Sequence, residues 1–461
     1  MNRNSLWSLR LGFSNKQAAA IENLGIKKFL EDSFKSSFDK KVPSFLDDSP
    51  KSSEDLKELR KATKDADPEV KKKIQREGIQ TNLAMKSWWI DKMREDEFPL
   101  REKMTCFWQN HYVATYQKVK VNYWVYQHNQ ICRTHAFGNF RELTKEIVQS
   151  NAVVRYLDNT DNRKGKINEN LSRELLELFT IGIGNYSEQD VQNGAKALAG
   201  LGLGDSKAMY RKVYEDNDSI TYFGKKGIFK VNEIVDIIFE QKNTPYYITR
   251  KILKWFIYDD PDEKLVTYYG DYFRKVDYEI KPLLVKIFTE EFDKDTAGSK
   301  IKNPLEFSLQ LLDELHIDTK NNNFLAQFLR QQNMDLFNQP NVKGWDGGRS
   351  WLTSQVYLQR NNLAYLLTNG KALNQKVLND NAMNPRKNNK QQEAKLDWQK
   401  GNNKEIISQL SNRLLFQVDD TSQKDFESIL KYDFDENAKN ADQAVLRLFN
   451  GMIKLPEFQL I

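Results

Sequence analysis

The sequence predicts a mainly α-helical protein, a large multi-helix domain with long polar loops and at most a short β-hairpin. Three observations support this fold class. Apolar residues recur at helical spacing, with capping signals, through most of the chain. A strand pattern occurs in one stretch only, residues 205–230, at 213–214 and 220–223. Hydrophobic residues make up 39% and aromatic residues 12% of the 461 residues, which is ample for a large core.

Residues 1–98 form the predicted N-terminal helical region. Ser14 and Gln17 make a capping box before its first helix. A proline- and serine-rich loop follows at 40–53, and Pro68 interrupts a strongly charged helical stretch. We expect helices at residues 14–24, 26–34, 53–73 and 78–93.

Residues 99–335 form the predicted central helical core, and 336–461 the C-terminal helical region. Pro99 suits the first position of a helix because its ring fixes a helical φ. Pro340 and three glycines make a turn at 336–351 that presents Trp345. An Asn-, Gln- and Lys-rich insertion at 370–404 is expected to be mobile or poorly packed. Helices are expected at 100–116, 119–133, 140–157, 168–180, 187–199, 232–241, 244–260, 266–276, 280–292, 304–317, 323–332, 356–367, 405–415, 423–430 and 441–452.

Composition excludes several classes of protein. Lys and Arg number 70 against 64 Asp and Glu, and a net charge of +6 is small for this length, so nucleic acid is a disfavoured partner. Cys106 and Cys132 are the only cysteines, which excludes a disulfide framework and a cysteine-rich zinc module. No apolar run approaches the roughly 20 residues of a membrane span. We therefore expect a cytoplasmic protein with reduced thiols.

The stretch 168–184, NENLSRELLELFTIGIG, carries the most chemistry. Asn168 is a good helix N-cap, and leucines follow at helical spacing. The opposite face carries four polar residues within reach of one another, Asn170, Arg173, Glu174 and Glu177. Two carboxylates beside one guanidinium are typical of a metal or acid–base site. The alternative is an ordinary surface ion pair between Arg173 and Glu177, which stabilises by only ~0.3–0.5 kcal/mol.

Three other places offer chemistry, and two of them have a plainer alternative. His111 lies on an apolar helical stripe, where a histidine is more often a hydrogen-bonded core residue than a ligand. His135 ends the following helix at a turn. Arg163 and Lys164 precede the 168–184 helix, and such a position favours an anion such as phosphate, sulfate or a carboxylate. A solvated basic turn explains these two residues equally well.

Several runs together resemble a family. They are LGF at 11–13, PLREKMTCFWQNHY at 99–112, RTHAFGNF at 133–140, YLDNTDNRKGKINENLSRELLELFTIGIGNYSEQD at 156–190, ITRKILKWF at 248–256 and QPNVKGWDGGRSWL at 339–352. In this order and over most of the chain, they resemble the bacterial family called domain of unknown function 1800. The resemblance implies a largely helical protein without a settled function. It also implies frequent coding beside an alkaline-phosphatase/sulfatase-like protein, and many members look exported.

The family's runs coincide with the residues that chemistry favours. We therefore expect one pocket built from Asn110, His111, His135, Arg163, Lys164, Asn168, Asn170, Arg173, Glu174, Glu177 and Trp345. In a metal version, His111, His135 and Glu174 bind zinc, iron or manganese, although no HExxH or Glu-x-x-His pattern is present. In a metal-free version, Glu174 or Glu177 is a general base, His111 or His135 is its partner, and Arg173 holds an anionic substrate.

Two functions remain after these exclusions. The first is a ligand- or substrate-binding protein, a hydrolase or transferase acting on an anionic or carbohydrate-like substrate. The second is a non-catalytic partner or assembly factor of the phosphatase/sulfatase-like protein, with the polar cluster as a buried network that fixes the fold.

Overall fold

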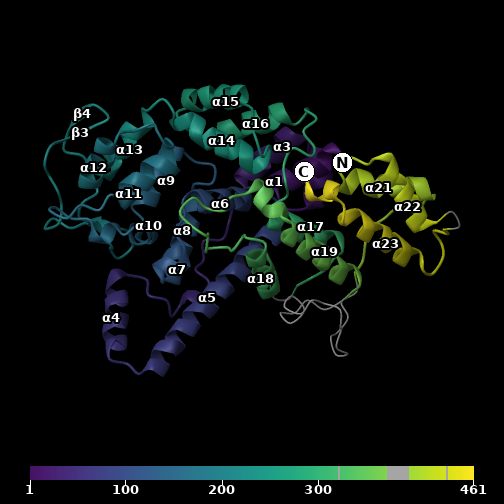
Figure 1. Ribbon diagram of the computed structural model, residues 1–461, viewed down its shortest axis with the longest axis horizontal. Coiled ribbons are helices and arrows are strands. Elements are labelled where there is room, and N and C mark those ends of the chain that lie inside the picture. Colours follow the sequence, from purple (N-terminus) through teal and green to yellow (C-terminus); the bar gives the residue numbers. More distant parts are fainter. Residues whose placement is uncertain (320–321, 371–393, 432–433) are drawn as a thin grey trace.

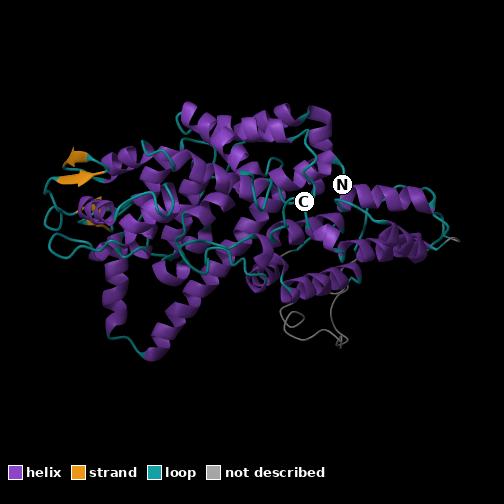
Figure 2. Cartoon of the chain, turned by 45° about the horizontal axis from the view of Figure 1, so that its top comes forward, coloured by secondary structure: helices purple, strands orange, loops and turns teal. Residues whose placement is uncertain are grey.

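Helices make up nearly all the regular structure of the computed structural model, which describes residues 1–319, 322–370, 394–431 and 434–461 (Figures 1 and 2). The short strands lie together at one end of the molecule (Figure 2). The prediction of a mainly α fold is confirmed.

The N-terminal helices are α1 (Arg3–Leu11), α2 (Ala18–Leu24), α3 (Ile26–Lys35), α4 (Ser53–Lys64) and α5 (Pro68–Glu95). Helices α4 and α5 form an arm that projects from the body (Figure 1). Ser52 starts α4 with a capping box, since its hydroxyl accepts from the Asp55 backbone N–H and the Asp55 carboxylate accepts from that of Ser52. The stretch 53–73 was predicted to be interrupted at Pro68, and it is two helices, of which the second, α5, begins at Pro68.

Helix α6 (Leu100–His111) is buried on nearly every side. Its charged residues are therefore paired inside the protein. Glu102 accepts two hydrogen bonds from Arg133, at 2.6 and 2.9 Å, and Lys103 donates to Glu306 at 2.5 Å. Helix α6 packs on α3, α5 and α8. The helices that follow it are α7 (Tyr116–Val119), α8 (Asn122–Thr134), α9 (Phe140–Val148), α10 (Asn151–Tyr156), α11 (Asn170–Glu174), α12 (Glu188–Ala197) and α13 (Val231–Phe239), and they extend towards the end that carries the strands (Figure 1).

The remaining helices continue along the chain towards the other end of the molecule (Figure 1). They are α14 (Thr244–Phe256), α15 (Glu263–Lys275), α16 (Ile280–Glu291), α17 (Pro304–Glu314), α18 (Asn323–Gln331), α19 (Ser354–Thr368), α21 (Asn403–Leu414), α22 (Asp420–Leu430) and α23 (Ala441–Ile453). Segments distant in sequence pack together, as α3 does on α16 and α5 on α18.

Two antiparallel strand pairs are present, and all their strands except the first lie within the stretch 205–230 where the sequence predicted strands. Strand β1 (Leu201–Gly202) pairs with β2 (Met209–Tyr210), with Leu201 opposite Tyr210. Strand β3 (Ile220–Tyr222) pairs with β4 (Lys225–Gly227), with Thr221 opposite Lys226. The prediction at 220–223 matches β3, whereas residues 213–214 lie in a turn because Tyr214 bonds back to the Arg211 carbonyl.

Hydrogen bonds cross the boundaries expected near residues 98 and 335. Arg10 donates to the Thr296 hydroxyl at 2.6 Å, and Arg360 donates to the Lys302 carbonyl at 2.9 Å. The backbones of Ile461 and Lys300 bond to each other. The division into three regions stays a prediction, and these bonds tie its parts together.

The insertion predicted at 370–404 falls largely on residues 371–393, which lie outside the described residues. Its last part differs from the expectation of poor packing. Leu396 and Trp398 pack against the core, and the Trp398 indole N–H donates to Asp442 at 2.8 Å. These two apolar side chains explain why the last residues of this polar stretch pack against the rest of the protein.

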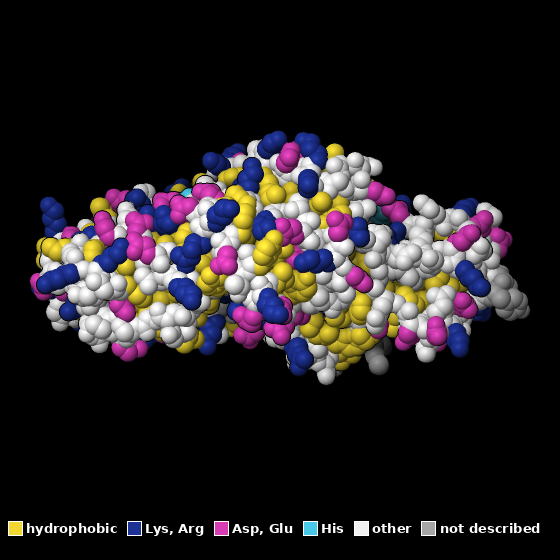
Figure 3. All heavy atoms as spheres, turned by 90° about the horizontal axis from the view of Figure 1, so that it is seen from above, with side chains coloured by type: hydrophobic (Ala, Val, Ile, Leu, Met, Phe, Trp, Pro, Cys, Tyr) yellow, Lys and Arg dark blue, Asp and Glu magenta, His cyan; other side chains and the backbone are white. Residues whose placement is uncertain are grey.

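Within the described ranges, no helix is long and apolar enough to cross a bilayer. On the face shown in Figure 3, acidic and basic side chains are interspersed.

Candidate functional site

The stretch that the sequence singled out contains an uncommon backbone feature. Helix α11 passes directly into a π-helical turn, Leu175–Thr180, in which the Ile181 N–H bonds the Leu176 carbonyl at 3.1 Å. Such wide turns are rare and often occur at functional sites. The helix begins at Asn170, two residues after the predicted N-cap. The N-cap is therefore Glu169 and not Asn168, whose side-chain oxygen accepts from the Asn170 N–H at 3.0 Å in the turn before the helix.

Side chains from α6 and α14 satisfy the carbonyls at the end of the π-turn. The Tyr247 hydroxyl donates to the Leu178 carbonyl at 3.0 Å. His111 bonds the Phe179 carbonyl through Nε2 at 3.0 Å. A helix end leaves such carbonyls without partners inside the helix, so these side chains complete it. This is the role of a hydrogen-bonded core histidine, the plainer of the two interpretations of His111.

The tautomer of His111 follows from its two bonds. Because a carbonyl only accepts, Nε2 must carry the proton, and Nδ1 is left to accept from the Lys251 ammonium at 3.0 Å. Burial, and then the charge of Lys251, lowers the pKa of His111 well below its usual value. His111 is therefore a neutral ring held between a lysine and a carbonyl.

Lys251 is the main residue that the sequence interpretation did not single out. Its Nζ also contacts the Leu178 carbonyl and the Tyr247 hydroxyl, each at 3.4 Å. Burial lowers the pKa of Lys251 to about 8. It lies within the family-like run at 248–256, and a signal was present there, because Lys251 shares a helical face with Ile248 and Trp255.

Arg173 lies at the centre of a carboxylate network on the outer side of α11. It donates to both oxygens of Glu188, at 2.9 and 2.8 Å, and to Glu169 at 3.0 Å. Glu177 lies 3.7 Å away and accepts a hydrogen bond from the Tyr186 hydroxyl. Three carboxylates thus surround the one guanidinium, and the role of Arg173 as the holder of an anionic substrate loses its basis.

Glu174 differs from these neighbours. It is half-buried, and it makes no hydrogen bond or ion pair with the described part of the chain. Burial, and then Glu177, raises the pKa of Glu174, against the opposite effects of Arg173 and Lys343. Burial raises the pKa of Tyr156 and of Tyr247, and the charge of Glu174 raises both further. A carboxyl group thus lies among two phenols and a second carboxylate without a partner of its own.

Asn110 fixes the Gly/Trp turn at 336–351 over this region. Its side-chain oxygen accepts from the Trp345 backbone N–H at 2.7 Å. Gly344 has φ +90°, and a Cβ there would lie 2.4 Å from the Asn110 oxygen, so the turn requires glycine. The turn brings Lys343 within electrostatic range of Glu174. Trp345 is 5% exposed, and its indole N–H has no acceptor in the described residues.

The chain belongs to the family described as protein of unknown function, DUF1800. The family match covers residues 5–460, nearly the whole chain, which confirms the resemblance seen in the sequence. No curated protein and no solved structure matches the chain.

His135 has a different environment from His111 in this DUF1800 chain. Its Nε2 bonds Glu146 at 2.6 Å, and the pair is partly exposed. Among the described residues, no three or more His, Cys, Asp or Glu side chains form a group that could hold a metal ion. The predicted metal set of His111, His135 and Glu174 is therefore not assembled, since both nitrogens of His111 are already bonded to other groups.

The basic and amide residues before α11 make bonds within the chain. Lys164 pairs with Asp218 at 2.8 Å, and the Arg163 guanidinium lies over the Tyr214 ring, 5.9 Å from its centroid. The amide of Asn170 donates to the Leu157 carbonyl at 3.1 Å, and that of Asn168 to the Asp158 carbonyl at 3.3 Å. Through Arg163 and Lys164, the loop 157–170 of this DUF1800 chain is held against residues 214–218, and Lys164 is already paired.

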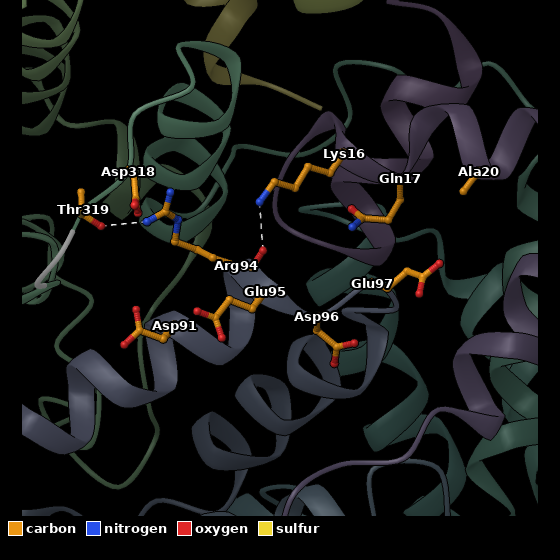
Figure 4. Close-up of a pocket in the computed structure, with 10 residues that line it drawn as sticks. All are labelled: Lys16, Gln17, Ala20, Asp91, Arg94, Glu95, Asp96, Glu97, Asp318 and Thr319. Atoms are coloured by element: carbon orange, nitrogen blue, oxygen red, sulfur yellow. Dashed lines mark hydrogen bonds between the residues drawn. The ribbon is translucent and has the colours of Figure 1, made fainter. Parts of the chain in front are cut away.

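A hollow of about 800 Å³ lies elsewhere, where the end of α5 meets the start of α2 and residues 318–319 (Figure 4). Five carboxylates line it, beside Lys16 and Arg94. Lys16 donates to the Arg94 carbonyl at 2.9 Å, and Arg94 donates to the Thr319 hydroxyl at 2.7 Å. None of the predicted site residues lines this hollow, and its cations are already bonded, so the Glu174 region remains the candidate site of this DUF1800 protein.

Proposed function

We propose that this protein is an acid–base enzyme, a hydrolase or transferase for a carbohydrate-like substrate, with Glu174 as the proton-transferring group and Glu177 as its partner. The observation that carries this proposal is the state of Glu174. It is half-buried, it has no bonded partner in the described chain, and its pKa is raised. Enzymes raise the pKa of a carboxyl group in this way when it must donate a proton near neutral pH.

The two neighbouring carboxyl groups have different surroundings, as acid–base pairs require. Glu177 accepts a hydrogen bond from Tyr186 and lies 3.7 Å from Arg173. Glu174 lacks such donors, so its neutral form is favoured. Glu174 is therefore suited to protonate a leaving group, and Glu177 to assist an attacking hydroxyl or water.

The local charge selects a neutral substrate over an anionic one. Four carboxylates, Glu169, Glu174, Glu177 and Glu188, lie around Arg173 and Lys343. An anion entering here meets more negative than positive charge, and Arg173 is already bonded to Glu169 and Glu188. Phenol side chains, which supply both apolar faces and hydroxyl groups, stand nearby. These surroundings favour an uncharged sugar over a phosphate or sulfate.

A π-turn is a suitable support for such a group. His111, Tyr247 and Lys251 fix the end of the turn from two other helices. They act as positioning residues, because a carboxyl group must be held within a fraction of an ångström of its working place.

The test is a screen of the purified full chain against aryl glycosides and oligosaccharides, with Glu174→Gln beside it. We expect turnover by the wild type and a loss of about 10²–10⁴-fold in Glu174→Gln, the usual contribution of acid–base catalysis. Glu69→Gln, the same change on the exposed arm, is the matched control and should keep full activity. Equal activity of Glu174→Gln and wild type would refute the assignment. An inactive wild type that instead binds a phosphatase/sulfatase-like protein would favour the non-catalytic alternative.

A further inference from the structure

A second and more enclosed cavity, of about 340 Å³, lies between α8 and residues 206–207. Its size falls within the roughly 300–1,000 Å³ of small-molecule sites. Glu146, the partner of His135, lines it, together with amide and hydroxyl side chains and an apolar wall of Trp124 and Ile131. This cavity shares no lining residue with the Glu174 region.

Several polar groups in this cavity have no partner in the described part of the chain. The Gln130 side chain interacts with the Tyr126 hydroxyl, but its buried N–H₂ makes no hydrogen bond of good geometry. The side chains of Gln127, Thr134 and Ser206 make no hydrogen bond to the described residues. Polar side chains that line a cavity and lack partners in the protein are available to a bound molecule or to water.

Other polar groups of the wall are held rigidly by the fold. Asn151 exchanges hydrogen bonds with the backbone of Gly204, at 2.9 and 3.0 Å. The Ser150 hydroxyl caps α10 by accepting from Val153 at 3.2 Å. The Trp124 indole donates to the Lys51 carbonyl at 3.0 Å. The cavity is therefore preformed, which limits the entropy lost when a ligand binds.

The charges of the cavity nearly balance. Glu146 is bonded to His135 at 2.6 Å, and Lys207 is a cation close enough to act on Glu146. Each charged side chain of the wall has an opposite charge beside it, so none is free to pair with a charged ligand. The amide and hydroxyl side chains can both donate and accept hydrogen bonds, as the hydroxyl groups of sugars do.

We propose that this cavity binds a small neutral polyhydroxylated molecule, a monosaccharide or polyol. Gln127, Gln130 and Ser206 donate to and accept from its hydroxyl groups, while Trp124 and Ile131 face its apolar side. The proposal does not depend on catalysis at Glu174.

The experiment measures binding of glucose, N-acetylglucosamine and myo-inositol to the full chain by saturation-transfer difference NMR and calorimetry. The protein carries Glu174→Gln, so that turnover at the proposed catalytic site does not consume the probe. Binding at that site is distinguished by its persistence in a variant that fills the cavity. Ser206→Trp fills the mouth from an exposed position and should abolish binding. Ser219→Trp, on an exposed loop that does not line the cavity, is the matched control and should bind as before.

Gln130→Met keeps the shape of the side chain and removes its hydrogen bonds, so it should weaken binding by about threefold to tenfold. Three results would overturn the proposal. They are no binding of any of the three probes, binding that Ser206→Trp and Gln130→Met leave unchanged, and selective binding of an amino acid or inorganic phosphate in their place.

Discussion

Lys302 offers a direct test of the electrostatics of the interior. Its side chain is fully buried, its Nζ has no hydrogen-bond partner among the described residues, and it lies 3.7 Å from the centroid of the Phe458 ring. Burial, and then the Arg360 charge, lowers the pKa of Lys302 well below its usual value. The folded chain therefore holds the amine neutral at a pH where the unfolded chain holds it protonated.

The sign of the pH effect follows from this difference. A lysine pKa that is lower in the folded state costs stability below its unfolded value, by about 1.4 kcal/mol for each pH unit down to the folded pKa. Lys302→Met has a similar length and no charge. Replacing buried charged groups by apolar ones is often neutral or stabilising by about 1–4 kcal/mol. We expect Lys302→Met to gain stability in this range at neutral pH, and to gain less as the pH rises towards about 10.

The assay is urea unfolding of both proteins at several pH values between about 6 and 9. Lys300→Met is the matched control, because Lys300 is equally buried but pairs with Glu306 at 2.9 Å. Burial alone would raise the pKa of Glu306, and Lys103 and Lys300 together hold that pKa below its usual value. Removing Lys300 should therefore destabilise by about 3 kcal/mol. A loss of stability in Lys302→Met, or a gain independent of pH, would refute the argument.

Three further predictions concern the candidate site. Burial lowers the pKa of Lys251 to about 8, so the free energy of unfolding that Lys251 contributes should fall as the pH drops towards about 8 and then stay constant. Urea unfolding of Lys251→Met should lack this pH dependence. Gly344→Ala should destabilise by about 2–3 kcal/mol, since φ is +90° and the new Cβ would meet Asn110; unaltered thermal unfolding would contradict this. If Glu174 is the acid, activity should decline as the pH rises through its raised pKa, whereas Glu174→Gln, which removes a half-buried carboxyl group, should unfold at an equal or higher urea concentration at neutral pH.

Helix spacing and capping signals predicted most of the architecture. Ser187 and Asp190 were expected to start a helix, and they form the capping box of α12. Pro68 was expected to interrupt a helix, and it begins α5. Apolar periodicity could not reveal the π-turn at Leu175–Thr180, since the same leucines fit an α-helix. The turn depends on bonds from α6 and α14, which lie far away in the sequence.

Site residues could be predicted where reactive side chains lie close together in the sequence. They could not be predicted where the contacts join residues that are far apart in the sequence. Glu174 was selected from its own helix, and the structure gives it unusual surroundings. His135 was grouped with His111 by residue type alone, and each has a different partner, Glu146 and Lys251. No spacing rule joins His111 to Lys251, because 140 positions separate them.

The π-turn links the buried and exposed parts of the candidate site. On its buried side, the carbonyls of Leu178 and Phe179 require donors, and the Lys251, Tyr247 and His111 side chains supply them. At its other end, the turn follows directly on Glu174, the last residue of α11. A loss of donors at the end of the turn leaves buried carbonyls unpaired, and the turn can then relax towards an α-helix. Such a relaxation moves Glu174 without changing it. Lys251→Met therefore tests whether the position of Glu174 matters as well as its carboxyl group, because the variant should lower activity while that carboxyl group remains present.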